Sequence, residues 1–174
     1  MSGYPKRRIG FGWLVVCCAL GLPQAWWDVS AAGPTGQTDP SRREYMRGVE
    51  LFHDGSFNEA VKAFRKAIDL DPKLAEAHFH LGLVYYQGKR QLAEAVTEMK
   101  QAIQINPSYV DATYELGLIY QIQGKFADSE QVLKRVMSLS PKHEDAHWAL
   151  SRQYLRNREI GKATTLFLAL LDFK

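Results

Sequence analysis

Apolar residues between positions 41 and 174 recur every three or four residues along segments of 12 to 15 residues. Two examples are the segments 75–87 and 92–105, which a short polar turn joins. This spacing puts the apolar side chains on one face of a helix. Two such helices with a short turn between them form a helical hairpin. The pattern therefore predicts an all-α region built from hairpins.

Proline and glycine recur with a period near 34 residues, which indicates internal repeats. The prolines lie 35 and 34 residues apart and the glycines 34 and 35 apart, at Pro72, Pro107 and Pro141 and at Gly48, Gly82 and Gly117. Alignment on these residues gives four repeats, 41–74, 75–109, 110–143 and 144–174. The second repeat contains one extra residue in its turn at 87–91.

Small residues recur at the positions where the two helices of a repeat must approach closely. They are Gly48, Gly82, Gly117 and Ser151 in the first helix, and Ala60, Ala95, Ser129 and Ala163 in the second. Residues 81–85 and 116–120 both read Leu-Gly-x-x-Tyr, an alanine follows later in the repeat, and Asp-Pro or Asn-Pro stands at the repeat end. Together with the 34-residue period, these features resemble the tetratricopeptide repeat. The resemblance covers residues 41–174, about three quarters of the chain.

The resemblance implies a right-handed superhelical solenoid of four helix-turn-helix hairpins. A hairpin of this kind cannot bury its own apolar face, so neighbouring hairpins cover one another. The first repeat fits an N-terminal end cap, because Arg43 and Arg47 stand where later repeats have Ala77 and Leu81. We expect water to cover that face. In the fourth repeat, Ser151 and Arg158 replace two glycines of the family pattern.

In proteins of this family the first helix of each repeat lines a concave groove, and its fifth, ninth and twelfth residues face the ligand. The resemblance thus implies groove residues Tyr45, Val49, Phe52, Phe79, Leu83, Tyr86, Tyr114, Leu118, Trp148 and Arg152. An aromatic residue at the fifth position can instead serve packing. The Lys and Asn clamp with which some members hold a peptide's terminal carboxylate is absent from these positions. The expected function is a non-catalytic protein-binding scaffold that holds a peptide or helix of an envelope partner.

The end of the fourth repeat is apolar where earlier repeats are charged. Leu168 stands where earlier repeats have Arg65, Lys100 and Lys134. We expect Leu166, Leu168, Leu171 and Phe173 to form an exposed patch, since no hairpin follows in this chain. An exposed apolar patch usually marks an interaction site. The alternative function is therefore a structural homo-oligomer, most simply a homodimer about a two-fold axis. The last helix could also tilt back and bury the patch on its own repeat.

The first 31 residues have the pattern of a signal peptide. Basic residues at 6–8 precede an uncharged stretch at 9–22, which is the length of a signal core and short for a membrane span. Small or branched residues at 29–31 predict cleavage after Ala31. The alternative is an uncleaved signal anchor with Trp26 and Trp27 at the membrane interface. Either alternative delivers the rest of the chain across the cytoplasmic membrane, most simply to a bacterial periplasm.

Residues 32–40 are rich in glycine, proline and polar residues and predict a flexible linker. Asp39 and Pro40 at its end have the pattern of a helix start, with Asp39 as N-cap. Both cysteines, Cys17 and Cys18, lie in the uncharged stretch. A bacterial lipoprotein has a small residue directly before its lipidated cysteine, whereas Val16 precedes Cys17 and Cys17 precedes Cys18. Lipidation at these cysteines is therefore disfavoured. We expect the mature chain to have no disulfide and no cysteine metal site.

Composition excludes several classes of function. The chain has 174 residues, 46% of them hydrophobic and 24% charged, with a net charge of +3. Residues 1–31 carry +2 of that charge, so the remainder is nearly neutral. A nucleic-acid-binding protein usually has a basic stripe. We therefore expect no nucleic-acid partner, and a membrane contact only through the N-terminal segment if it is retained.

One motif offers a catalytic alternative. Residues 143–147 fit the H-E-x-x-H pattern of zinc hydrolases, with His143, Glu144 and His147 in the motif positions. The motif begins two residues after Pro141, which places His143 at or before the start of a helix. No histidine follows to supply the third protein ligand that a catalytic zinc needs. The sequence therefore predicts no enzyme, no metal and no cofactor, with zinc hydrolysis as a distant third alternative.

Overall fold

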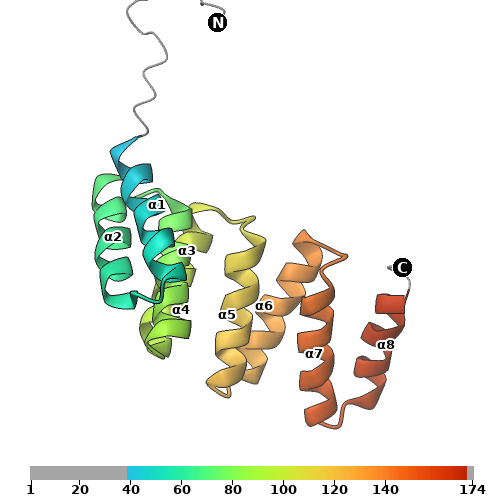
Figure 1. Ribbon diagram of the computed structural model, residues 1–174. Coiled ribbons are helices and arrows are strands. Elements are labelled where there is room, and N and C mark those ends of the chain that lie inside the picture. Colours follow the sequence, from blue (N-terminus) through green and yellow to red (C-terminus); the bar gives the residue numbers. More distant parts are fainter. Residues whose placement is uncertain (1–38, 172–174) are drawn as a thin grey trace, which may run out of the picture. The chain divides into compact units, whose positions relative to one another are not determined.

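The computed structural model describes residues 39–171, which fold into helices joined by short connections (Figure 1). The described residues 39–171 belong to one compact unit. The helices are α1 (Pro40–His53), α2 (Phe57–Leu70), α3 (Ala75–Leu83), the π-helical turn η3 (Val84–Gly88), α4 (Leu92–Ile105), α5 (Val110–Ile122), α6 (Phe126–Leu139), α7 (Glu144–Arg156) and α8 (Ile160–Leu171). The predicted signal segment at 1–31, most of the linker and Phe173 lie outside the described residues. Within 39–171 no helix is both long and apolar enough to cross a membrane.

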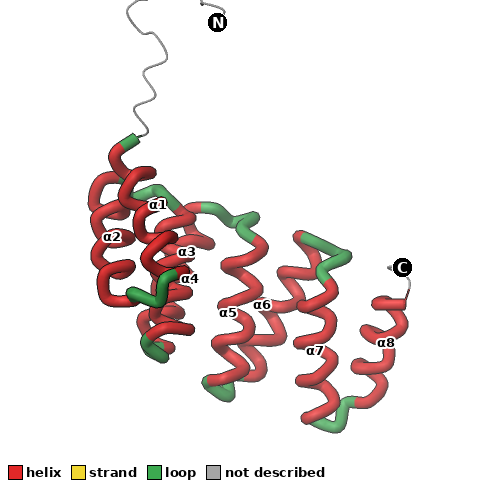
Figure 2. Tube along the Cα trace, in the orientation of Figure 1, coloured by secondary structure: helices red, strands yellow, loops and turns green. Residues whose placement is uncertain are grey.

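Consecutive helices pair as hairpins, and each hairpin stacks on the next (Figure 2). The pairs are α1 with α2, α3 with α4, α5 with α6, and α7 with α8. Small residues lie between the paired helices as the repeats predict, and Ala60, Ala95 and Ser129 are wholly buried. The all-α solenoid of four hairpins is thereby confirmed.

The buried side chains form two main clusters along the stack. The first extends from α2 to α5 and contains Phe64, Met99 and Ile119, all wholly buried. The second extends from α6 to α8 and contains Leu133 and Leu150. Each cluster is built from neighbouring repeats, because a single hairpin has too little apolar area to enclose a core of its own.

The first helix of the second repeat differs from the expected continuous helix over 75–87. It is α-helical only to Leu83 and continues as the π-helical turn η3. The extra residue of this repeat is the reason. The backbone N–H of Gln91 donates to the carbonyl of Tyr85, six residues earlier (2.8 Å), whereas Lys125 donates to Tyr120, five residues earlier (2.9 Å). The wider turn absorbs the insertion and keeps α4 in register.

Each hairpin turn contains one residue with left-handed backbone. Glycine fills this position in two repeats, Gly55 and Gly124, both with φ 74°. Arginine fills it in the other two, Arg90 with φ 55° and Arg158 with φ 60°. Left-handed backbone costs an L-residue about 1–2 kcal/mol because its Cβ crowds the following carbonyl. The two arginines therefore hold a backbone conformation that glycine would adopt without strain.

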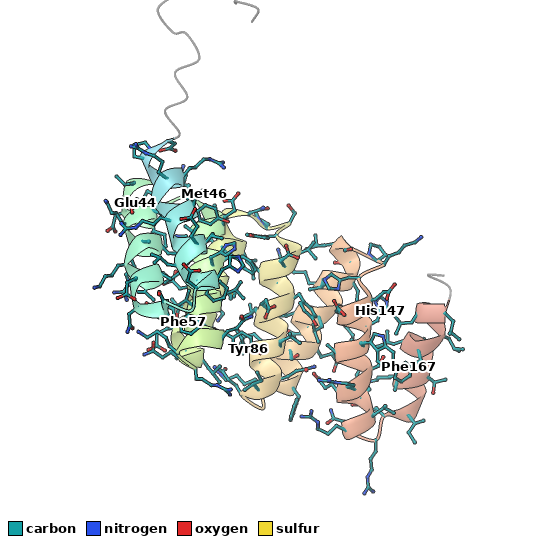
Figure 3. All side chains as sticks on the ribbon, in the orientation of Figure 1. Glu44, Met46, Phe57, Tyr86, His147 and Phe167 are labelled. Atoms are coloured by element: carbon teal, nitrogen blue, oxygen red, sulfur yellow. The ribbon has the colours of Figure 1, made fainter. Side chains whose placement is uncertain are left out.

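The two ends of the stack differ in polarity. The predicted N-cap is confirmed, since Asp39 Oδ1 accepts a hydrogen bond from the Ser41 N–H (3.0 Å). Arg43 and Arg47 of α1 are exposed, as expected for an end cap. At the other end, α8 exposes apolar side chains, with Leu168 58% and Leu171 66% exposed. Figure 3 labels Glu44 and Met46 on α1 and Phe167 on α8.

Candidate groove on the first helices

A hollow of about 420 Å³ lies on the first helices of repeats two to four. Its lining residues are Tyr86, Leu118, Gln121, Ile122, Arg152 and Arg156. Three of the predicted groove residues, Tyr86, Leu118 and Arg152, thus come together from three consecutive repeats. The apolar side chains form part of its wall and the arginines lie on α7.

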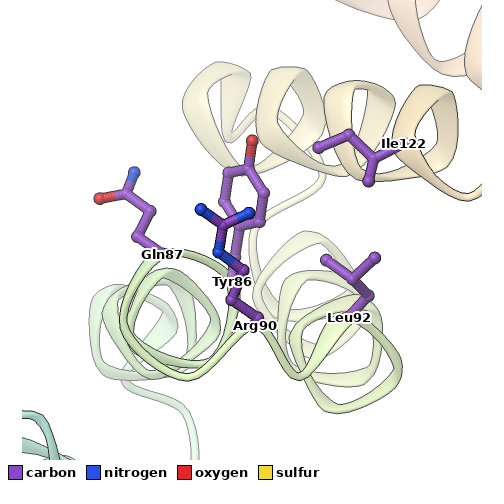
Figure 4. A pocket seen from close by; sticks show the side chains of 5 residues that line it. All are labelled: Tyr86, Gln87, Arg90, Leu92 and Ile122. Carbon is purple, nitrogen blue, oxygen red and sulfur yellow. The ribbon is translucent and has the colours of Figure 1, made fainter.

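A second hollow of about 410 Å³ adjoins the first, since Tyr86 and Ile122 line both. Gln87, Arg90 and Leu92 complete its wall. In Figure 4 the Ile122 side chain of α5 and the Leu92 side chain of α4 point toward one another, and Tyr86 and Arg90 project into the same space. We call the two adjoining hollows together the turn-edge hollow, because they lie at the ends of the first helices.

Two glutamines, of which Gln153 is buried, fix the α5–α7 junction beside the turn-edge hollow. Gln121 Nε2 donates to the carbonyl of Ala149 (3.1 Å) and to Gln153 Oε1 (2.9 Å). Gln153 Nε2 in turn donates to the carbonyl of Phe126 (2.8 Å). Gln153 is 2% exposed, so these bonds lie in a region of low dielectric and hold the two helices firmly.

A carboxyl group and two phenols lie in the groove beside the hollow. Burial raises the pKa of Glu115, and the nearby carboxylate of Asp111 raises it further. Burial is also the main cause that raises the pKa of Tyr86 and of Tyr114, with Glu115 acting in the same direction. Glu115 Oε2 is buried without a hydrogen-bond partner in the described region. At neutral pH the phenols of Tyr86 and Tyr114 are therefore uncharged, and the carboxyl group of Glu115 is partly desolvated.

The groove residues of the first two repeats are more enclosed. Tyr45, Val49, Phe52 and Leu83 are half-buried and pack against the first cluster. Phe79 is only 9% exposed, and its ring lies 5.1 Å from that of Tyr109. Without a ligand, the Phe79 ring serves packing, because it helps to form the wall beneath the groove.

The fourth repeat presents the most exposed aromatic side chain of the predicted set. Trp148 is 50% exposed, and its ring meets that of Phe167 edge-on at 5.2 Å. Tyr114 is half-buried, and its ring lies 4.9 Å from the His143 ring. Trp148 can therefore offer an aromatic face to a ligand while one edge stays anchored.

The histidines of the H-E-x-x-H match serve local structure. His143 is the N-cap of α7, and its Nδ1 accepts a hydrogen bond from the Ala146 N–H (3.2 Å). His147 is 4% exposed, and its Nδ1 donates to the carbonyl of His143 (3.0 Å). No group of three histidine, cysteine or acidic side chains within residues 39–171 is arranged to hold a metal ion.

Sequence reasoning missed several residues of the turn-edge hollow, among them Arg90, Ile122 and Arg156. Ile122 and Arg156 occupy the thirteenth position of the repeat, one residue beyond the positions that the family pattern assigns to the groove. An isoleucine at a position that is otherwise polar was the available signal, and Ile122 is indeed 57% exposed. Arg90 lies in the turn that holds the inserted residue, which the repeat alignment had already located.

The stacked hairpins define a helical-repeat protein with a hollow on its first helices. The chain belongs to the tetratricopeptide repeat family. Family models described as TPR repeat match residues 48–88 and 89–124, and one described as tetratricopeptide repeat matches 110–143. Repeats of this family generally form non-catalytic scaffolds for protein–protein interaction. No curated protein sequence matches the chain.

Solved structures share the fold. MamA superposes with a TM-score of 0.73 and 24% identity over 86% of this chain and 85% of that chain. The MamA RS-1 ArsTM double mutant has a TM-score of 0.70 and 20% identity over 90% and 88% of the two chains. The first TPR of Spaghetti (RPAP3), bound to the HSP90 peptide SRMEEVD, has a TM-score of 0.65 and 21% identity over 68% and 93%.

Proposed function

We propose that this protein is a non-catalytic scaffold that acts outside the cytoplasm and binds a peptide or helix of an envelope partner in its groove. The observation that carries the proposal is the turn-edge hollow, which gathers Tyr86, Leu118 and Arg152 from three repeats. A peptide-bound structure of a similar fold, the first TPR of Spaghetti, supports it. Exposed aromatic side chains such as Trp148 fit the anchors typical of protein interfaces.

We expect Trp148→Ala to weaken partner binding about 30-fold, because truncating an aromatic anchor typically removes about 2 kcal/mol or more. The partner is first captured in its own cells by a photo-crosslinking residue placed at Leu118, with Lys62 of the outer helix α2 as the control position. Affinity for that partner is then measured by titration. Adducts from position 62 alone would place the binding surface elsewhere, and an unchanged affinity of Trp148→Ala would show that the bound segment does not reach Trp148.

Export is part of the same proposal and rests on the signal pattern of residues 1–31. We expect Val16→Asp to leave the protein in the cytosol, since a charge in the apolar core opposes insertion by about 2.5–3.5 kcal/mol. Val16→Leu is the control and should be exported normally. Cell fractionation with N-terminal sequencing provides the measurement. Wild-type protein found in the cytosol with residue 1 intact would contradict export.

A second candidate function is self-association through α8. The exposed Leu168 and Leu171 favour it, together with the charged α1 at the opposite end. A head-to-tail stack would bury Arg43 and Arg47 against these leucines without ion-pair partners, which is unfavourable. Contact between two α8 helices about a two-fold axis avoids that burial and closes the assembly. Of the other predicted contact residues, Leu166 is half-buried in the second cluster.

We expect the protein to sediment as a dimer at micromolar concentration and Leu168→Lys with Leu171→Lys to sediment as a monomer. Each leucine contributes about 1.5–3 kcal/mol when fully buried, so two charges at these positions would remove the association. Sedimentation velocity, with all proteins in the same detergent buffer, measures the oligomeric state. Ile122→Lys is the control, at an exposed apolar site away from α8. A wild-type monomer would refute this second candidate and leave the groove proposal intact.

A further inference from the structure

The turn-edge hollow has a basic rim of three arginines. Arg90 lines one of its halves, and Arg152 and Arg156 line the other. All three are exposed. None of them takes part in the ion pairs formed within residues 39–171. The Arg156 guanidinium lies 5.5 Å above the Phe126 ring, which keeps it beside the hollow. Three positive charges therefore surround a partly apolar floor.

Glu115 lies beside this rim, but burial raises its pKa, and it forms no ion pair with any of the three arginines among the described residues. The exposed acid of α7 lies apart from Arg156. Asp145 stands at the start of α7 and Arg156 at its end, eleven residues later. A rise of about 1.5 Å per residue separates them by about 16 Å. Exposed charges are largely screened beyond a Debye length of about 8 Å at physiological ionic strength. The groove thus has an acidic edge at Glu76, Asp111 and Asp145 and a separate basic edge, to which repeats two and four contribute the arginines.

General helix preferences account for only one of the arginines. A basic residue is favoured in the last helical turn, which explains Arg156. Arg152 lies one turn earlier, and its side chain lines the hollow. Arg90 holds left-handed backbone at a position that is glycine in two other repeats, so its place is maintained against local strain. The π-helical turn that precedes Arg90 is a distortion found often at functional sites.

We propose that the turn-edge hollow binds a segment of a partner protein in which acidic side chains meet Arg90, Arg152 and Arg156 while apolar side chains rest on Tyr86, Leu118 and Ile122. This inference rests on the proposed function of the groove and specifies the partner's chemistry. Guanidinium groups bind carboxylates through paired hydrogen bonds, and an apolar floor provides the remaining contact. The acidic segment approaches from the turn side, away from Asp111 and Asp145.

The test begins with selection of short random peptides displayed on phage against the full chain in mild detergent. We expect the selected peptides to combine Asp or Glu with Leu or Phe. A synthetic peptide of the selected sequence and its counterpart with every acid replaced by the amide are then compared by fluorescence anisotropy. The acidic peptide should bind more tightly, and raising NaCl from about 0.05 to about 0.5 M should weaken it selectively.

The variant Arg90→Gly separates recognition from folding. It should weaken binding of the acidic peptide about two- to fivefold, as for loss of one exposed charge pair. It should also raise the Tm by about 2–4 °C, because glycine relieves the left-handed backbone. Arg158→Gly is the matched control, since it relieves the same conformation outside the hollow. It should raise the Tm equally and leave the affinity unchanged.

Arg152→Gln and Arg156→Gln should each weaken the acidic peptide by a similar factor without altering the affinity of the amide peptide. Selected peptides without acidic enrichment, or equal binding of the acidic and amide peptides, would overturn this inference while leaving a peptide-binding groove in place. Peptides that bind but crosslink only to the outer helices, or a selection that yields no binding peptide, would overturn both this inference and the proposed function.

Discussion

Phe64→Ala should lower the free energy of unfolding by about 3–5 kcal/mol, the largest loss that we expect from a single substitution in this chain. Phe64 is wholly buried between the first two repeats. Its ring lies 6.0 Å from that of Tyr45 and 5.8 Å from that of His80. Removing it leaves a cavity at a junction that holds α1 to the rest of the stack. Denaturant unfolding followed by circular dichroism measures the loss.

The matched control for Phe64→Ala is Phe167→Ala. Both phenylalanines occupy the same position of their repeats, but Phe167 is half-buried at the end of the stack. Its loss should be no more than about half as large, since less apolar area leaves water there on folding. Equal losses at the two positions would show that burial in the stack does not determine the contribution of this repeat position.

Gly48→Ala should destabilise the protein by about 1–3 kcal/mol, although alanine is the better helix former. A Cβ at position 48 would lie 2.6–3.0 Å from three atoms of the Phe64 ring. The ring is rigid and enclosed, so one of the helices must shift. Without that contact the substitution would stabilise α1 by about 1 kcal/mol. The sign of the measured change in unfolding free energy therefore decides whether the helices are as close as the structure places them.

Two further variants support the interpretation of Gly48→Ala. Ser151 occupies the same position in the fourth repeat, where a Cβ is already accommodated, and its hydroxyl has no hydrogen-bond partner among the described atoms. Ser151→Ala should therefore be neutral or stabilising. Combining Gly48→Ala with Phe64→Leu should cost less than the sum of the two single changes, because a smaller side chain leaves room for the new methyl group. Strict additivity would argue against a direct clash.

Much of the fold could be predicted from the sequence because each repeat constrains the others. The 34-residue period and the small residues at matching positions located every hairpin, and Asp39 marked the first helix start. The polarity of Arg43 and Arg47 predicted an exposed end. These signals are local or periodic, so they can be recognised in the sequence without knowledge of the packing.

The candidate site was harder to predict because it depends on contacts between repeats. The family pattern supplied Tyr86, Leu118 and Arg152 but could not show that they share one hollow. The insertion in the second repeat was visible, yet its effect on Arg90 and Tyr86 depends on how the helix absorbs one extra residue. A π-helical turn and a longer loop both satisfy the sequence pattern. Only the backbone shows that the π-helical turn forms.

The division of the core into two clusters links ligand binding to cooperativity along the array. Tyr86 packs against the first cluster and Leu118 against the second, yet both line the turn-edge hollow. In a repeat array the units at an end can open while their neighbours stay folded. Opening of α7 and α8 removes Arg152 and Arg156 and abolishes the half of the hollow that they line, whereas Arg90 and Leu92 of the other half stay in place. A ligand that contacts both halves of the hollow therefore shifts the population toward the array in which all four repeats are folded. By the same mass action, the fraction of molecules with a folded last repeat determines the affinity for that ligand.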